Sequence, residues 1–259
     1  MSLYIERQGQ GPDLVLLHGW GLHGGIFANL VPQLSERFRL HQVDLPGHGR
    51  SAPHPSLADI HALASYLGKQ LPSDAIWLGW SLGGRVALAA AAQQLPIRAL
   101  ILVGSTPCFC QREDWPHGMP ESELAQFRSA LTQDYRATLQ RFLALQSRGS
   151  SQGREELRQL RESLFAHGEP HPDALAMGLA LLRDADLRNQ LADIHIPTLV
   201  LHGQRDTLAP LAAAEYLART LPLASLQVID GAGHAPFISH PDEFLQVLLH
   251  WYQQQSQKP

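Results

Sequence analysis

The chain alternates short, almost continuously apolar runs with segments that have helical hydrophobic spacing. Six apolar runs are bounded by turn residues, at 14–17, 40–43, 75–78, 99–103, 198–201 and 226–229. Runs of this length suit the strands of a parallel sheet that is buried on both faces. Polar loops follow the runs, and open α/β sheets build their sites at the carboxyl ends of the strands. The pattern predicts an α/β fold with a mostly parallel central sheet and helices on both faces.

One long segment, residues 106–193, interrupts this alternation. It has few β-branched runs and is rich in Leu, Ala, Gln, Arg and Glu, a composition that favours helices. We expect several helices there with no strand between them. The organisation predicted is a single domain over residues 1–259, with a helical lid over 106–193 inserted above the carboxyl ends of the strands.

Composition narrows the class of protein. The 259 residues carry a net charge of −4 and no polybasic tract, which argues against nucleic-acid binding. No apolar stretch reaches the roughly 18 residues of a membrane span, and the start of the chain lacks the pattern of a signal peptide. Cys108 and Cys110 cannot form a disulfide framework, so we interpret them as free thiols. We expect a cytoplasmic monomer with no membrane partner.

The sequence Gly79-Trp80-Ser81-Leu82-Gly83 is a G-x-S-x-G motif. It lies between the apolar run at 75–78 and an alanine-rich segment, Val86 to Ala92. This is the order strand, sharp turn, helix, in which the serine hydroxyl is exposed on a strained turn and flanking glycines keep side chains away. The motif alone is common, but in this setting it predicts that Ser81 is a nucleophile.

A nucleophilic serine needs a base and an acid that orients the base. Asp206 follows the run at 198–201, and His234 follows the run at 226–229 in a glycine-rich turn. The order Ser, Asp, His is that of α/β-hydrolases. Three other aspartates compete for the acid's role: Asp184, Asp186 and Asp230. The last is too close in sequence to the histidine to come from another loop, and we predict the triad Ser81, Asp206 and His234.

Acyl transfer also needs hydrogen-bond donors for the oxyanion. The main-chain N–H of Leu82 is the first candidate, because it begins the helix after the serine. The N–H of Trp20 is the second, from the loop His18 to Gly21 after the first apolar run. A packing role for the Trp20 indole is the alternative interpretation, and the two roles are compatible.

Histidines at ligand spacing raise the alternative of a metal site. His167 and His171 are the closest pair, but Gly168 and Pro170 argue against a helix that would align them. We expect no metal and no cofactor.

These motifs together resemble the α/β-hydrolase superfamily over nearly the whole chain. Three stretches, 78–84, 141–146 and 234–241, resemble more specifically the BioH-type pimeloyl-[acyl-carrier protein] methyl ester esterases of biotin synthesis. The resemblance implies hydrolysis of a methyl ester while the acyl chain stays on its carrier. It also implies substrate contacts from Trp20, Ser81, Leu82, His234 and the lid residues Phe142, Leu143, Ala144, Leu145 and Gln146.

A basic stripe in the lid fits an acidic carrier protein. Residues 128–161 contain seven arginines and three acidic residues. Arg154, Arg158 and Arg161 share one helix face, and Leu157, Leu160 and Leu164 lie on an adjacent face that can pack on the core. With Arg141, these three arginines are the candidate carrier-binding residues. A solvated helix face is the alternative.

The acyl chain would need a narrow apolar tunnel. Trp80, Phe142, Leu143 and Leu145 are candidates for its lining, although Phe142 and Leu145 also suit the core of a lid helix. A short-chain carboxylesterase, lipase, thioesterase or carbon–carbon bond hydrolase with the same triad is the nearest alternative function. A non-catalytic binding protein of this fold is more remote, because all three triad residues are present.

Overall fold

The computed structural model describes residues 2–54, 56–57 and 59–256. Within them lies a seven-stranded sheet of order β1-β3-β2-β4-β5-β6-β7. All neighbouring strands are parallel except β1 and β3. The predicted α/β fold with a mostly parallel sheet is confirmed. The strands are β1 (Tyr4–Gln8), β2 (Asp13–Leu17), β3 (Arg39–Asp44), β4 (Ala75–Trp80), β5 (Ile97–Val103), β6 (Thr198–Gly203) and β7 (Ala224–Ile229).

Strand β1 is absent from the apolar pattern of the sequence. Its residues, YIERQ, are exposed or half-buried, and it pairs antiparallel with β3 at the edge of the sheet. An edge strand needs no continuous apolar run, because part of it faces water. The central strand β2 is the opposite case: Leu14 to Leu17 are all fully buried.

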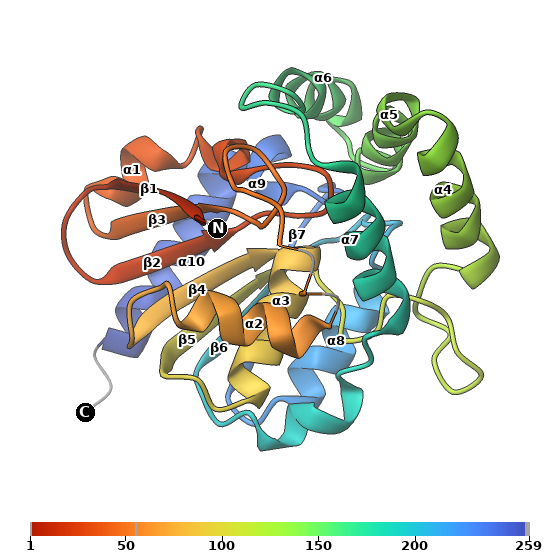
Figure 1. Cartoon of the computed structure of the whole chain (residues 1–259). Helices are drawn as coiled ribbons and strands as arrows, with labels where there is room; N and C mark the ends of the chain where they lie inside the picture. The colour runs from red at the N-terminus through yellow and green to blue at the C-terminus, as the bar shows by residue number, and fades with distance from the viewer. Residues whose placement is uncertain (1, 55, 58, 257–259) are drawn as a thin grey trace.

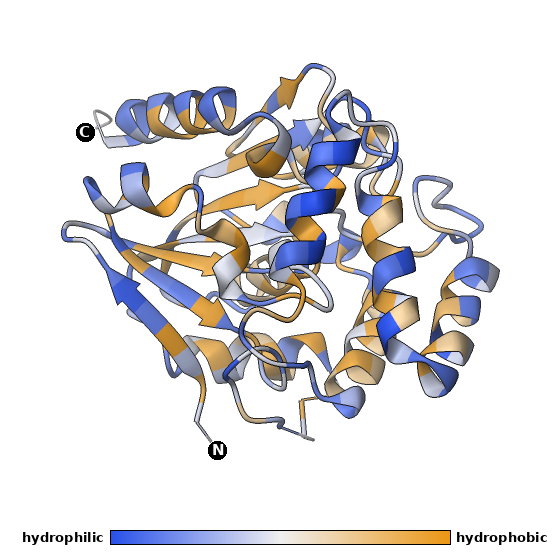
Figure 2. Cartoon of the chain, turned by 90° about the horizontal axis from the view of Figure 1, so that it is seen from above, coloured by the Kyte–Doolittle hydropathy of each residue, from blue (hydrophilic) through white to orange (hydrophobic). Residues whose placement is uncertain are grey.

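Helices cover both faces of the sheet. In Figure 1, α2, α3 and α8 lie in front of the strands and α10 runs behind them. Figure 2 shows hydrophobic residues concentrated on the strands between these layers. None of the helices in the described part of the chain is long and apolar enough to span a bilayer. The elements outside the lid are η1 (Gly24–Phe27), α1 (Val31–Ser35), α2 (Ile60–Gly68), α3 (Leu82–Ala92), α8 (Leu211–Thr220), α9 (Pro236–Ser239) and α10 (Pro241–Ser256).

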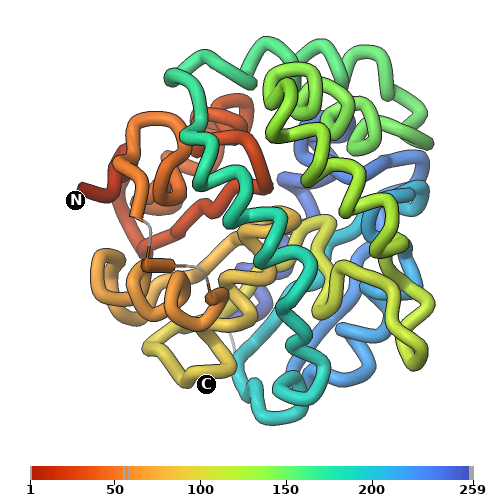
Figure 3. The backbone as a smooth tube through the Cα atoms, turned by 45° about the vertical axis from the view of Figure 1, so that its right-hand side comes forward, coloured from red at the N-terminus to blue at the C-terminus, as the bar shows by residue number. Residues whose placement is uncertain are grey.

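The lid is an inserted helical segment between β5 and β6. It contains α4 (Glu121–Gln133), α5 (Tyr135–Gln146), α6 (Gly153–Ser163) and α7 (Pro172–Asp184), followed by the 3-10 helix η2 (Arg188–Asp193). As predicted, no strand lies among these helices, although residues 108–119 form isolated bridges instead of a helix. Figure 3 shows α7 crossing between the N-terminal half of the core and the other lid helices.

Arg85 ties the lid to the helix that follows Ser81. It lies on α3 and is 1% exposed. Its guanidinium donates to the main-chain oxygens of Leu181 (3.2 Å), Leu182 (3.1 Å) and Ala185 at the end of α7. Carbonyl groups at a helix C-terminus lack partners and carry partial negative charge. Burial lowers the pKa of Arg85 to about 10, so the group is charged at neutral pH.

Replacing Arg85 with methionine should lower the free energy of unfolding by about 3 kcal/mol, because buried carbonyl groups lose charged donors. Urea unfolding followed by circular dichroism measures this. Arg98→Met is the control: Arg98 lies on β5, and its ion pair with Asp74 is largely exposed. That change should cost less than about 1 kcal/mol. Equal losses in the two variants would contradict the role given to Arg85.

Candidate active site

Ser81 sits on the sharp turn between β4 and α3. Its backbone has φ 55° and ψ −115°, a region that non-glycine residues rarely adopt. The turn requires glycine at the two flanking positions, because a side chain there would collide with neighbouring backbone. A Cβ on Gly79 would lie 2.4 Å from the Gly83 oxygen, and one on Gly83 would lie 2.2 Å from the Leu17 oxygen. The strained serine is held by its N–H, which donates to Val103 of β5 (2.9 Å).

Asp206 and His234 form the second part of the site. Asp206 Oδ2 accepts from His234 Nδ1 at 2.8 Å. The other oxygen, Oδ1, accepts the main-chain N–H groups of Leu208 and Ala209, both at 2.9 Å. Burial alone would raise the pKa of Asp206, but the charge and hydrogen bond of His234, with His202 and Ala209, hold it below its usual range. The ionised acid thus orients the imidazole.

The tertiary structure brings these two residues to the same edge of the sheet as Ser81. Trp80, next to the serine, donates its indole N–H to the His234 oxygen (2.9 Å), and the two rings are 5.7 Å apart. A Cβ on Gly104, at the end of β5, would lie 3.3 Å from His234 Nδ1 and 3.5 Å from Asp206 Oδ2. Nε2 of His234 is buried and has no hydrogen-bond partner among the described residues.

The loop after β2 lies against the serine. A Cβ on Gly19 would be 3.3 Å from Ser81 Cβ. The main-chain N–H groups of Trp20 and Leu82 donate no hydrogen bond within the described part of the chain. Both residues are almost fully buried. Most buried N–H groups have a partner within the protein, so these two are unusual. As neither is engaged in the described chain, both predicted donors are free to bind an oxyanion.

His18 orients this loop. No motif in the sequence predicts a role for it. Its Nδ1 lies 2.7 Å from the Gly19 oxygen, and its Nε2 accepts from the N–H of Leu45 (2.9 Å). Burial, with a contribution from His48, lowers the pKa of His18 to about 3, so the neutral ring donates from Nδ1. In a trans peptide the carbonyl and the next N–H point in opposite directions. Holding the Gly19 carbonyl therefore sets the direction of the Trp20 N–H.

Trp20 also has the packing role that was its alternative. Its indole N–H donates to Leu175 of α7 (2.9 Å), and its ring meets Phe142 edge-on at 4.8 Å. Trp80, a candidate for the tunnel lining, is fully buried against His234 and Phe237. It packs against His234 from the interior of the protein.

The five consecutive lid residues 142–146 do not share one surface. Phe142, Leu143 and Gln146 lie on the buried face of α5, and Leu145 is half-buried. Ala144 is exposed, because successive residues of a helix are rotated by about 100°. The structure therefore does not bring Ala144 together with the other four.

The basic stripe is less cationic than its arginines suggest. Arg158 forms ion pairs with Glu155 and Glu162 on the same helix face. Glu162 lies one residue beyond the window counted in the sequence, and α6 contains three arginines and three glutamates. Arg154 and Arg161 are exposed and form no ion pair within the described residues.

The leucines on the adjacent face of α6 pack on the core, as predicted. Leu160 and Leu164 are buried in the core, and Leu157 packs against it. Arg141 is exposed on α5, where its guanidinium lies 5.4 Å from the Phe127 ring.

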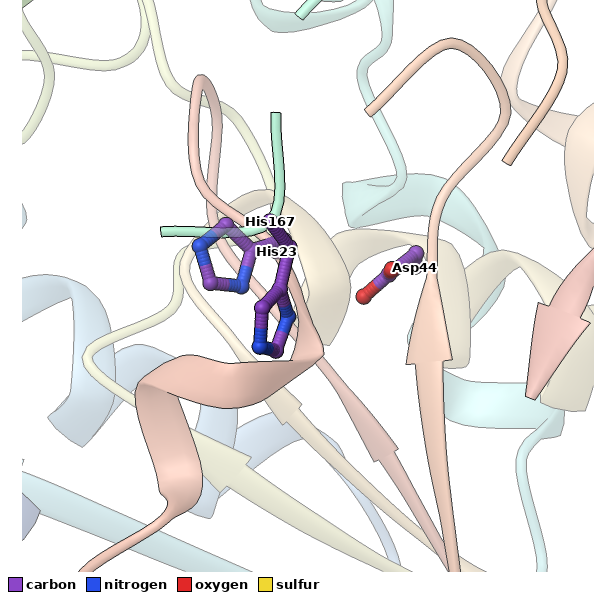
Figure 4. Close-up of side chains that lie close together, drawn as sticks. All are labelled: His23, Asp44 and His167. Atoms are coloured by element: carbon purple, nitrogen blue, oxygen red, sulfur yellow. The ribbon is translucent and has the colours of Figure 1, made fainter. Parts of the chain in front are cut away.

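His23, Asp44 and His167 place atoms able to bind a metal within 4.8 Å of one another. Figure 4 shows these three side chains. Both oxygens of Asp44 already have donors: Oδ1 accepts from Gly24 (2.8 Å), and Oδ2 accepts two N–H groups of Arg50 (2.9 and 2.8 Å). A cation would have to displace and face the Arg50 guanidinium, so this donor set fits a metal poorly.

His23 instead links the core to the lid. Its Nδ1 accepts from Gly25 (3.1 Å), its Nε2 contacts the Ser163 oxygen of α6 at 2.6 Å, and its ring stacks on His167 at 4.3 Å. His171, which the sequence places near His167 but without the helix that would align the two, accepts the Asp173 N–H at the start of α7.

The connection between α5 and α6 contacts the loops that carry Asp206 and His234. His234 donates its N–H to the Gln146 oxygen (3.3 Å), and Ser151 donates to the Gly231 oxygen (2.8 Å). Gly149 has φ +86°, and a Cβ there would lie 2.6 Å from the Arg205 oxygen. We call residues 146–153 the lid seat. It touches the loops of both Asp206 and His234.

Comparison with known proteins agrees with this geometry. The model of a family described as the alpha/beta hydrolase family matches residues 14–247. The chain is 47% identical to the pimeloyl-[acyl-carrier protein] methyl ester esterase of Xanthomonas campestris pv. campestris (strain B100), over 95% of this chain and 97% of that protein. It is 44% identical to the protein of the same name from Nitrosomonas europaea, over 94% and 97% of the two chains. The solved esterase EaEST from Exiguobacterium antarcticum superposes with a TM-score of 0.86 at 26% identity, covering 97% of this chain and 95% of that one.

The chain therefore belongs to the alpha/beta hydrolase family. Within it, the identity over nearly its whole length makes it a member of the pimeloyl-[acyl-carrier protein] methyl ester esterases, which are carboxylic ester hydrolases.

Replacing Gly149 with alanine should slow hydrolysis of a short p-nitrophenyl ester by about tenfold, because the new methyl group pushes the lid seat off the Asp206 loop. Stopped-flow or plate-reader kinetics measure kcat. Gly168→Ala is the matched control: Gly168 also has a positive φ, +101°, but the nearest atom to its Cβ is 3.6 Å away. Both changes should cost about 1–2 kcal/mol of stability through backbone strain. A kcat that falls equally in both would show that strain alone is responsible.

Proposed function

We propose that this chain hydrolyses the methyl ester of pimeloyl-[acyl-carrier protein], releasing pimeloyl-[acyl-carrier protein] and methanol in biotin synthesis. The observation that carries the proposal is the hydrogen-bonded Asp206–His234 pair beside the strained Ser81 turn. The relatives at 47% and 44% identity carry this activity in their names.

In the proposed mechanism the Ser81 hydroxyl attacks the ester carbonyl carbon while Nε2 of His234 takes its proton. The carbonyl oxygen becomes an oxyanion, which accepts hydrogen bonds from the N–H groups of Trp20 and Leu82. When the carbon–oxygen bond to the methoxy group breaks, His234 returns the proton and methanol leaves. Water then attacks the acyl-serine by the same relay and releases the free carboxylate.

The charge of Asp206 and the N–H groups of Trp20 and Leu82, which are free in the described chain, support the roles given to them in this mechanism. Asp206 is ionised and buried, so it stabilises the imidazolium that forms at His234. The two oxyanion donors have no competing partner in the described chain, and each such donor typically contributes a factor of about 10² to 10³ in kcat. His18 contributes indirectly, by holding the peptide that presents the Trp20 N–H.

We further propose that the substrate's acyl chain lies along the apolar surface formed by Trp20 and α5. Trp20 and Phe142 are in ring contact, Leu143 is buried beside them on α5, and Leu145 is half-buried. Apolar side chains around a few polar groups are typical of sites for small ligands. Ala144, on the exposed side of α5, is excluded from this wall.

An acyl carrier protein would dock on the arginine side chains of α5 and α6. Arg154 and Arg161 are the strongest candidates, since both are exposed without an acidic partner. Arg158 contributes less, because Glu155 and Glu162 already neutralise it. Arg141 extends the same positive surface onto α5. Complementary charge of this kind governs encounter and register more than final affinity.

Replacing Ser81 with alanine should abolish hydrolysis of a short p-nitrophenyl ester and labelling by a fluorophosphonate probe, because the attacking oxygen is removed. The fold should persist, as judged by circular dichroism. Since removal of a triad nucleophile typically costs about 10⁶ in kcat, residual turnover near the wild-type rate would refute the mechanism. Complementation of a biotin-requiring strain that lacks its own esterase tests the biological role with the same pair of proteins.

Reversing both Arg154 and Arg161 to glutamate should raise KM for the carrier-linked ester by about tenfold and leave the short ester unaffected, because only the carrier uses the charge. Steady-state kinetics on both substrates separate the effects. The matched control reverses Arg37 and Arg219, which are exposed outside the lid, with the same change in net charge. Parallel losses on both substrates would indicate a damaged lid.

A further inference from the structure

Lid helix α6 buries an acid that the mechanism above does not use. Glu156 is 0% exposed, and neither of its carboxylate oxygens makes a hydrogen bond of good geometry in the described structure. Its neighbour Glu155, on the same helix, is exposed and pairs with Arg158. Burying a carboxylate that is not well hydrogen-bonded is costly, so the position of Glu156 calls for an explanation.

The lid seat places Glu156 near the loop that carries His234, where the main-chain N–H of the next residue, Ala235, is a donor to its carboxylate. The seat leads directly into α6, and α6 packs on α9, which begins two residues after His234. Gln146, at the other end of the seat, is also 0% exposed, and its side-chain amide has no partner in the described residues. Two buried polar side chains without a hydrogen bond of good geometry in the described structure thus lie beside a loop whose imidazole Nε2 is itself unpartnered there.

The ionisation of Glu156 depends on its surroundings, and one of the groups that favour its charged form is His234. Burial raises the pKa of Glu156 to about 7, while the Ser150 hydroxyl as a hydrogen-bond donor, the charge of His234 and the main-chain N–H of Ala235 as a second donor oppose this rise and favour the ionised form. Asp206 opposes ionisation. Both acids therefore interact with one imidazole.

No other titratable group is placed as close to Glu156 by the elements that pack on α6. In the described structure, neither η1 nor α9 contains a titratable side chain. Helix α5 contributes Arg136 and Arg141, which are exposed, and Tyr135, which is half-buried. His23 contacts α6 at Ser163, the opposite end of the helix.

We propose that Glu156 is a second acidic positioning residue of the active site, which stabilises from the lid the protonated His234 that forms during the reaction. This inference rests on the proposed function, because it assumes that His234 is the base. Ionised Glu156 favours the imidazolium, and it does so through His234 without touching the substrate. Because Glu156 belongs to the lid, the charge that supports the base is present only while the lid is seated.

The test compares Glu156→Gln with the wild type on a short p-nitrophenyl ester between pH 5 and 9. Glutamine keeps the shape and removes the charge, so kcat at pH 8 should fall by about tenfold. Without the negative charge His234 loses its proton more easily, and the acidic limb of the kcat/KM profile should move to lower pH. Glu155→Gln, the exposed neighbour, should keep both the kcat and the limb of the wild type.

Each result decides for or against the proposal. A fall in kcat together with a shifted limb supports it. A fall with the limb in its wild-type position means that Glu156 only packs, and an unchanged kcat means that it does not act on His234; either overturns the proposal. If Glu156→Gln does not fold, Glu156→Asp takes its place: it retains a charge and should keep the limb within the wild-type range, and a limb moved to lower pH would overturn the proposal. Failure of the proposed function is seen separately, as activity that survives Ser81→Ala.

Discussion

The strained turn at Ser81 is the constraint on which the rest of the site depends. Its positive φ projects the hydroxyl away from the sheet, but such a backbone is stable only if its surroundings hold it. Gly79 and Gly83 allow the chain to close to within a distance that any side chain would block. The same contact sets Gly83 against the end of β2, and Gly19 of the following loop lies against Ser81. The Ser81 turn and the loop that contains Trp20 are therefore held next to each other by this close approach.

Burial decides the charge of the groups around that turn. His18 is buried with one nitrogen donating and the other accepting, so the neutral ring is the stable form. Asp206 is equally buried, yet two main-chain N–H groups and an imidazole keep it ionised. A neutral histidine holds the loop that contains Trp20, and a charged aspartate holds the imidazole of His234. Similar burial thus has opposite consequences, because the hydrogen-bond partners differ.

The lid contacts the loops around Ser81, Asp206 and His234 as well as covering them. Arg85 joins α7 to the helix that begins after Ser81, and the lid seat touches the loops of Asp206 and His234. A partner that binds the outer arginines of α6 therefore acts on a helix whose inner face bears Glu156. Because α6 packs on α9, which follows the His234 loop, close packing can transmit small displacements of this helix to that loop.

Much of this architecture is determined locally. The apolar runs predicted six of the strands, the glycines around Ser81 predicted the turn, and the order of Ser81, Asp206 and His234 predicted the class of chemistry, because each is a short-range pattern. Strand β1 was missed, since an edge strand with the residues YIERQ has no apolar run. The charge of the α6 stripe was overestimated, since Glu162 pairs with Arg158 only once the helix is formed. The role of His18, the exposure of Ala144 and the burial of Glu156 were decided by tertiary structure alone. Hydrogen-bond partners, solvent exposure and the electrostatic environment of an acid depend on residues distant in sequence, and only packing brings those residues together.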